Sequence, residues 1–249
     1  MLRSAREING YTLLASDGEI GTCNDFLFDD RDWVVRYMVA NTRKWLPGRK
    51  VLVSPASLGE PDWSSRLFPV NLSREQIKES PALDDNAPVS RQYERSFYEF
   101  LGYGLYWEGT GLWGARPDPA GIVHPVPRIG EPPLSDQEVQ EGHVRSMNEV
   151  HGYEIHGSDA QVGVVEDFVI DDSDWAIEWL VVDTRKWLPG KKVLISPEWI
   201  ESVDWVASRV DIAMTAGQIR NSPEYDPEFP VNREYEARLY DFYGRPKQR

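Results

Sequence analysis

Apolar and polar residues alternate along several short stretches of this chain, which is the pattern of half-buried β-strands. The stretch from Trp33 to Thr42 has β-branched and aromatic residues at alternate positions, and the stretch from Trp175 to Thr184 repeats this pattern. Further short apolar runs occur at residues 50–53, 67–72 and 209–214. Asp, Gly and Pro separate such runs at intervals of about 8 to 12 residues, which predicts a small β-barrel or sandwich.

The hydrophobic period changes after the last strand of each pattern and there predicts helices. The tetrapeptides that begin at Ser73 and Thr215 fit a capped first helical turn. Ser90 and Asn232 then occupy N-cap positions in front of an apolar i, i+4, i+7, i+8 stripe. The stripe residues are Tyr93, Phe97, Phe100 and Leu101 after Ser90, and Tyr235, Leu239, Phe242 and Tyr243 after Asn232. We therefore expect each strand set to be followed by a short helix and a C-terminal amphipathic helix.

The two patterns are copies of one sequence. Asn41–Pro55 returns as Asp183–Pro197, an offset of 142 residues, and the alignment runs without a gap from Gly10 to Gly102. Identity is roughly 40% over about 90 positions, far above chance. We expect a first repeat with its C-terminal helix at residues 1–103 and a second at residues 148–249. Residues 104–147 form a connector rich in Gly, Pro and aromatic residues, in which Ser135 begins a predicted short helix.

The core of each repeat resembles the PRC-barrel family. The resemblance rests on Asp25–Pro55, with its Trp33-Val-Val strand and Trp45-Leu-Pro-Gly turn, and on the copy at residues 167–197. The family takes its name from the cytoplasmic β-barrel of the photosynthetic reaction centre H subunit, and it includes the C-terminal domain of the ribosome maturation factor. The resemblance implies a mainly β fold with α-helices, in which two small six-stranded barrels stand in tandem.

The tandem form is similar to bacterial stand-alone PRC-barrel proteins. The family is not known for catalysis, and its members act mostly in interaction or assembly, so the resemblance implies a non-catalytic function. The H subunit's membrane helix and the maturation factor's N-terminal domain have no counterpart in this sequence, so neither specific role is carried over.

Composition excludes several classes of partner. The 249 residues carry 27 Lys and Arg against 41 Asp and Glu, a formal net charge of −14. Bulk binding of nucleic acid or of an anionic membrane needs a positive field and is not expected. Cys23 is the single cysteine, so no intramolecular disulfide forms. The sequence shows neither a signal peptide nor the roughly 18 to 20 apolar residues of a membrane span, which predicts a cytoplasmic protein.

Each repeat gathers four cations around its Trp-Leu-Pro-Gly turn. The candidate interaction residues are Arg43, Lys44, Trp45, Arg49 and Lys50 in the first repeat and Arg185, Lys186, Trp187, Lys191 and Lys192 in the second. In one interpretation, these turns bind an acidic peptide, a carboxylate-rich surface or a phosphate. In the other, the cations pair with nearby acids and the tryptophan packs inward. Pro and Gly explain such a turn by geometry alone, which favours the second interpretation.

The connector aromatics are a second candidate surface. Tyr106, Trp107 and Trp113 follow one another within a short Gly-rich stretch. Exposed, they would dock a partner or a second copy of the chain. The favoured alternative is a strap packed over one end of a barrel.

The sequence contains no recognisable catalytic, metal or cofactor motif. Its histidines have no zinc-ligand spacing, and the acidic turn Asp29–Asp32 lacks the Gly and distal Glu of a calcium loop. Phosphate-binding glycine motifs and the nucleophile elbow are also missing. We therefore expect no catalytic residue, no metal ligand and no cofactor.

These observations favour a non-catalytic protein-interaction or assembly module. Its partner is unknown, and association into a homo-oligomer is compatible with the sequence. The alternative is a small-ligand or ion-binding protein that uses a cleft between the two repeats. A third alternative, an enzyme with a connector site built around His124 or His143, has the least support in the sequence.

Overall fold

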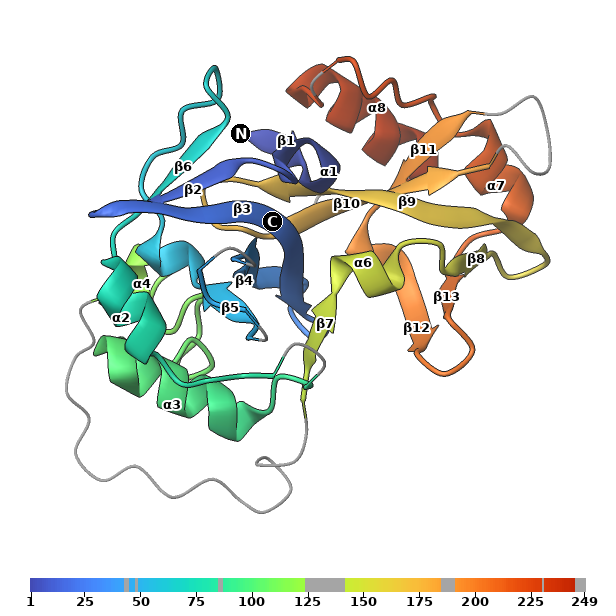
Figure 1. The fold of residues 1–249 in the computed structure, drawn as a ribbon. Helices are drawn as coiled ribbons and strands as arrows, with labels where there is room; N and C mark the ends of the chain where they lie inside the picture. Colours follow the sequence, from blue (N-terminus) through green and yellow to red (C-terminus); the bar gives the residue numbers. More distant parts are fainter. Residues whose placement is uncertain are drawn as a thin grey trace. The chain divides into compact units, whose positions relative to one another are not determined.

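The computed structural model of the protein describes seven ranges of the chain. These are residues 1–42, 45–47, 49–84, 87–123, 142–184, 191–229 and 231–244. The protein is mainly β with short helices, and its strands form one sheet of six and one of seven strands (Figure 1). The mainly β prediction is thereby confirmed. The helix predicted from Ser135 lies outside the described residues.

The chain divides into two compact units, whose boundaries differ from those of the two sequence repeats. The first unit consists of Glu7–Ser146 together with Ser173–Ala176. The second unit consists of Met1–Arg6, Met147–Asp172 and Ile177–Arg249. Each unit thus includes a short segment from the other sequence repeat.

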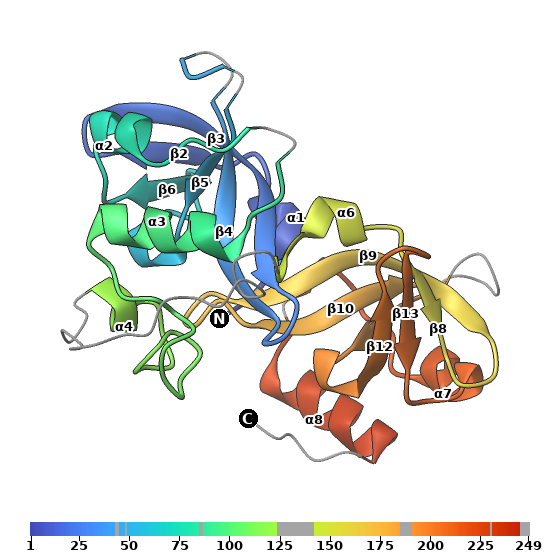
Figure 2. The same ribbon diagram turned by 90° about the horizontal axis from the view of Figure 1, so that it is seen from below.

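The first unit contains the six-stranded sheet, in which β5, β4, β3, β2 and β6 are neighbours in that order and β7 pairs with β3. Its strands are β2 (Thr12–Ala15), β3 (Gly18–Asp29), β4 (Val34–Asn41), β5 (Val51–Val53), β6 (Leu67–Val70) and β7 (Val144–Ser146). Its helices are the end of α1 (Ala5–Ile8), a 3-10 helix (Pro55–Ser57), α2 (Arg74–Glu79), α3 (Arg91–Leu101) and α4 (Ala120–Val123). Helices α2 and α3 lie beside this sheet (Figures 1 and 2).

The second unit contains the seven-stranded sheet, ordered β11, β10, β9, β8, β13 and β12, with β1 paired to β9. Its strands are β1 (Leu2–Ser4), β8 (Glu154–His156), β9 (Gln161–Asp171), β10 (Ile177–Asp183), β11 (Lys192–Ile195), β12 (Ile200–Asp204) and β13 (Arg209–Ile212). Its helices are α6 (Met147–Val150), a 3-10 helix (Pro197–Trp199), α7 (Ala216–Asn221) and α8 (Arg233–Tyr243).

Neither sheet closes into a ring through the strand pairs of the described residues. The path of the first sheet ends at β5 and β6, and that of the second at β11 and β12. The sheets therefore support two matching strand sets, whereas closed six-stranded barrels stay a prediction.

Helix starts follow the local sequence. Ser73 and Thr215 each form a capping box, in which the side-chain oxygen accepts from the N3 backbone N–H and the N3 Gln side chain accepts from the cap backbone. Ser90 and Asn232 accept hydrogen bonds from the N3 backbone of α3 and α8. All four predicted helix starts are confirmed.

The two repeats share unusual backbone positions. Trp33 and Trp175 have φ of 55° and 64°, and Arg66 and Ser208 both have φ of 55°. Each pair is separated by 142 residues. A left-handed conformation costs a non-glycine residue roughly 1–2 kcal/mol. Its recurrence at matching positions indicates that the repeats keep the same turns although their surfaces differ.

The buried face of α3 differs from the predicted stripe. Phe97 is buried and packs edge-on against Tyr37 of β4, with 5.5 Å between ring centroids. Phe100 is instead 41% exposed, while Arg91 and Glu94 are buried. The stripe rule misplaces this face because it counts only apolar residues, and here two charged residues are buried as a pair.

Candidate functional site

The basic turn of the first repeat is used largely for internal bonding. Arg43 and Lys44 lie outside the described residues. The Arg49 guanidinium donates to the Lys78 carbonyl oxygen at 2.5 Å and also reaches the Ser80 hydroxyl at 2.9 Å. Arg49 therefore satisfies free carbonyls at the C-terminal end of α2. Lys50 Nζ donates to the carbonyl oxygen of Ala87 at 3.1 Å.

The corresponding turn of the second repeat has similar contacts. Arg185, Lys186 and Trp187 lie outside the described residues. Lys191 Nζ donates to the Ser222 carbonyl oxygen at 2.5 Å, just after α7, and so corresponds to Arg49 in position and in contact. Lys192 Nζ forms an ion pair with Glu166 at 2.9 Å. The described cations of both turns thus bind their own unit.

The connector aromatics pack into the first unit. Tyr106 and Trp113 are buried and Trp107 is half-buried. Trp113 Nε1 donates to the Asp174 carbonyl oxygen at 2.7 Å, and Trp107 lies edge-on to Tyr106 with 4.8 Å between centroids. In this position the aromatics tie the connector to the sheet and to α3.

Tyr106 also belongs to a buried polar cluster around Glu94 of α3. The Tyr106 hydroxyl lies 2.8 Å from Glu94 Oε1 and accepts from Arg91 Nη1 at 2.8 Å. The Arg36 guanidinium stands 3.8 Å from the centre of the Tyr106 ring. Burial raises the pKa of Glu94 to about 7, although the Arg91 charge and hydrogen bonds from Tyr106 and Tyr37 oppose that rise. Every member of this cluster is buried, so it holds the connector in place rather than contacting a ligand.

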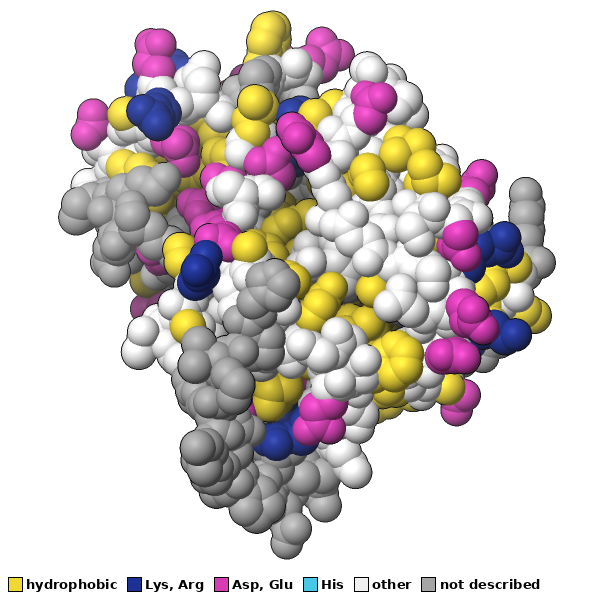
Figure 3. Space-filling view, turned by 90° about the vertical axis from the view of Figure 1, so that its left-hand side faces the viewer, with side chains coloured by type: hydrophobic (Ala, Val, Ile, Leu, Met, Phe, Trp, Pro, Cys, Tyr) yellow, Lys and Arg dark blue, Asp and Glu magenta, His cyan; other side chains and the backbone are white. Residues whose placement is uncertain are grey.

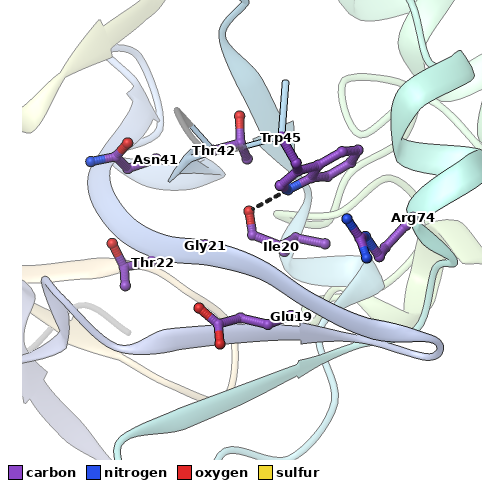
Figure 4. Close-up of a pocket in the computed structure, with 8 residues that line it drawn as sticks. All are labelled: Glu19, Ile20, Gly21, Thr22, Asn41, Thr42, Trp45 and Arg74. Atoms are coloured by element: carbon purple, nitrogen blue, oxygen red, sulfur yellow. Dashed lines mark hydrogen bonds between the residues drawn. The ribbon is translucent and has the colours of Figure 1, made fainter. Parts of the chain in front are cut away.

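An open groove of about 540 Å³ lies in the first unit, at the edge of β3 where β4 ends (Figure 4). It is lined by Glu19, Ile20, Gly21, Thr22, Asn41, Thr42, Trp45 and Arg74. The close approach of β3 and β4 requires Gly21, because a Cβ there would stand 2.1 Å from the Asn41 carbonyl oxygen. The groove therefore has a rigid floor of paired strands.

Trp45 and Arg74 form one wall of the groove. Trp45 Nε1 donates to the Ile20 carbonyl oxygen at 2.8 Å, which fixes the indole against the edge of β3. The Arg74 guanidinium carbon lies 4.9 Å from the Trp45 ring centre, within cation–π range, and Figure 4 shows the two side chains next to each other. Arg74 makes no ion pair with any residue that the structure describes. Glu19 extends from β3 at the same groove and is exposed.

The equivalent positions of the second repeat have different chemistry. Ala216 replaces Arg74, and Asp183 replaces Asn41. Gln161 replaces Glu19, so the second repeat also loses an acid. The formal charge of these three positions is zero in the first repeat and −1 in the second, and only the first repeat has a cation there.

Of the candidate residues predicted from the sequence, the structure brings Trp45 to this groove, and the other described candidates lie elsewhere. Sequence reasoning missed Arg74, which appeared only as the first helical residue after the Ser73 cap. The replacement of Arg74 by Ala216 between repeats was the available signal. On the face drawn in Figure 3, hydrophobic side chains lie in several separate patches among acidic, basic and uncharged side chains.

Two further findings bear on function. Within the described ranges, no group of three or more His, Cys, Asp or Glu side chains is arranged to hold a metal ion. Among the same residues, every helix is too short or too polar to cross a membrane.

Comparison with known families gives one match. Residues 143–218 match the family model described as the PRC-barrel domain. The matched stretch begins just before β7 and ends within α7. Comparison with curated proteins gave no match.

Proposed function

We propose that this chain, whose residues 143–218 carry a PRC-barrel domain, is a non-catalytic interaction or assembly module that binds an acidic peptide segment of a partner protein. The PRC-barrel family is generally non-catalytic. We extend the family to the first repeat because the repeats share roughly 40% identity. In this proposal the two sheets are the barrels of a cytoplasmic tandem protein.

The carrying observation is the Arg74 guanidinium beside Trp45 at an open groove. A guanidinium binds a carboxylate through two parallel hydrogen bonds, and an indole face packs against apolar side chains. An acidic segment with a neighbouring apolar residue satisfies both groups. Charge favours the same repeat, since residues 1–103 carry 13 Lys and Arg against 15 Asp and Glu, whereas residues 148–249 carry 11 against 20.

Variants of the full chain test this site. Labelled peptides that combine Asp or Glu with an aromatic residue are titrated by fluorescence polarisation against wild type and Arg74→Ala. Loss of a charged hydrogen bond, about 1.5–3 kcal/mol, predicts a weakening of at least about tenfold. Glu19→Gln removes a repelling surface charge and should strengthen binding by a few-fold, about 0.2–1 kcal/mol.

Lys78→Ala is the matched control, because Lys78 is an exposed cation on the same helix that does not line the groove. It should bind acidic peptides like wild type. Equal weakening by Arg74→Ala and Lys78→Ala would contradict the proposed site, and so would equal binding of acidic and neutral peptides.

The second candidate function is the binding of a small carboxylate or phosphate. It is supported by the groove volume of about 540 Å³, within the range of small-molecule pockets. A thermal-shift screen separates the candidates. Small anions that raise the melting temperature of wild type but not of Arg74→Ala would favour this second function.

A further inference from the structure

The leading strand of each repeat lies in the sheet of the other repeat. Strand β1 is the first strand of the first repeat but pairs antiparallel with β9, through Leu2↔Asp171, Arg3↔Ile170 and Ser4↔Val169. Strand β7 precedes the second repeat but pairs antiparallel with β3, through Leu27↔Ser146, Phe28↔Arg145 and Asp29↔Val144. Each of the two units contains one such pairing (Figure 1).

The two exchanged strands are equivalent in sequence and in register. Leu2-Arg3-Ser4 and Val144-Arg145-Ser146 are separated by the same 142 residues as the rest of the repeats, and their pairing partners are separated by 142 residues as well. The family match that begins at residue 143 includes β7, so the leading strand belongs to the PRC-barrel sequence itself.

The side chains of the two strands also make matching contacts. Ser4 Oγ donates to Asp167 Oδ2 at 2.5 Å, and Ser146 Oγ donates to Asp25 Oδ2 at 2.6 Å. Arg3 lies 3.7 Å from Asp172, and Arg145 lies 2.9 Å from Asp30. Each unit therefore has the same accepting edge, which holds an Arg-Ser strand by two acidic side chains.

We propose that these edges also accept the leading strands of a second copy of the chain, so that two copies assemble by exchanging repeats. The first repeat of one copy then joins the second repeat of the other, and every β1–β9 and β3–β7 contact is kept. This inference goes beyond the proposed groove and does not depend on it.

The monomer and the exchanged dimer have the same strand contacts, so chain connectivity and protein concentration decide which of them forms. Within one chain, the two repeats are linked and have an effective concentration of about 1 mM relative to each other. Refolding at about 5 µM should then leave roughly one chain in a hundred in exchanged dimers, whereas refolding at about 500 µM should place roughly a third of the chains there.

A disulfide across one exchanged pair records the outcome. Leu2→Cys with Asp171→Cys joins directly opposed, half-buried positions of an antiparallel pair, whose usual Cα separation suits a disulfide. Cys23 is buried, and burial raises its pKa, so its thiol stays unreactive. The full-length variant is unfolded, refolded at both concentrations and oxidised.

Non-reducing electrophoresis then separates chains linked internally from chains linked to each other, and peptide mass spectrometry identifies the 2–171 bond. We expect linked monomers after dilute refolding and about a thirtyfold larger share of 2–171-linked dimers after concentrated refolding. Linked monomers alone at both concentrations would overturn the proposal. Dimers that form equally with Leu2→Cys alone would also overturn it, because that variant lacks the second cysteine of the pair.

Discussion

Glu94 should make the stability of the protein depend on pH. Its side chain is fully buried on α3, between Arg91, Tyr106 and Tyr37, with Asp29 bonded to the same Tyr106 hydroxyl. Burial raises its pKa from 4.5 to about 7, so the folded state holds the proton more tightly than the unfolded state.

The sign and size of the effect follow from linkage. The stabilising contribution of the bound proton is complete below pH 4.5 and is lost as the pH rises through about 7. A shift of that size corresponds to about 3 kcal/mol of unfolding free energy. Glu94→Gln carries no titrating proton, so its unfolding free energy should gain about 3 kcal/mol relative to wild type between pH 4.5 and pH 8.

Urea unfolding of both proteins, measured by circular dichroism at intervals of pH, tests this reasoning. Glu236→Gln is the matched control, since Glu236 occupies the equivalent position on α8 and is only half-buried. The control should follow the wild-type curve. Parallel curves for wild type and Glu94→Gln across this range would refute the account of the buried cluster.

Five further substitutions, which make three predictions, test other parts of the fold. Ser4→Ala and Ser146→Ala should each cost about 1.5–3 kcal/mol in urea unfolding, because each removes a hydrogen bond to a carboxylate, and a loss below about 0.5 kcal/mol would contradict the strand anchoring. Gly21→Ala should lower the melting temperature and reduce the unfolding free energy by about 3 kcal/mol. The reason is that the added Cβ would stand 2.1 Å from the Asn41 carbonyl oxygen. An unchanged melting temperature would exclude this close approach. Arg49→Ala should speed amide hydrogen exchange in α2, because Arg49 bonds carbonyls at the end of that helix. Arg49→Lys should retain part of the protection, since Lys191 makes the corresponding contact in the second repeat. Equal protection of α2 in Arg49→Ala and Arg49→Lys would exclude the capping role.

Local rules predicted the helix starts and the general fold class well. The capping boxes at Ser73 and Thr215 depend only on neighbouring residues, so a single sequence suffices to find them. The alternation from Trp33 to Thr42 correctly indicated a strand, which the structure has as β4. Strand closure into barrels is a long-range property that this alternation does not determine.

Features that depend on distant partners escaped prediction. Strands β1 and β7 are three residues long, too short for any period, and nothing local says which sheet they join. The buried face of α3 was not predicted because Arg91 and Glu94 form an ion pair in the core. A rule that counts only apolar residues places both of them on the surface. Arg74 was missed because a lone arginine at a helix start has no motif of its own.

One difference between the repeats is the residue at position 36 of β4 and its equivalent in β10, and it depends on whether the connector covers that residue. Arg36 of β4 is fully buried under Tyr106 and Trp113 of the connector, and its guanidinium donates to the Leu112 carbonyl oxygen at 2.5 Å. The equivalent residue of β10 is Glu178, which is half-buried. A buried charge needs partners, and Arg36 has an ion pair with Asp32 at 3.1 Å in addition to the connector aromatics and the Leu112 carbonyl oxygen. The connector therefore makes the first repeat structurally distinct from the second, and the Arg74–Ala216 difference makes it chemically distinct. Under the proposed function, acidic segments bind the first repeat, which has Arg74 at the groove, and not the second, which has Ala216 at that position.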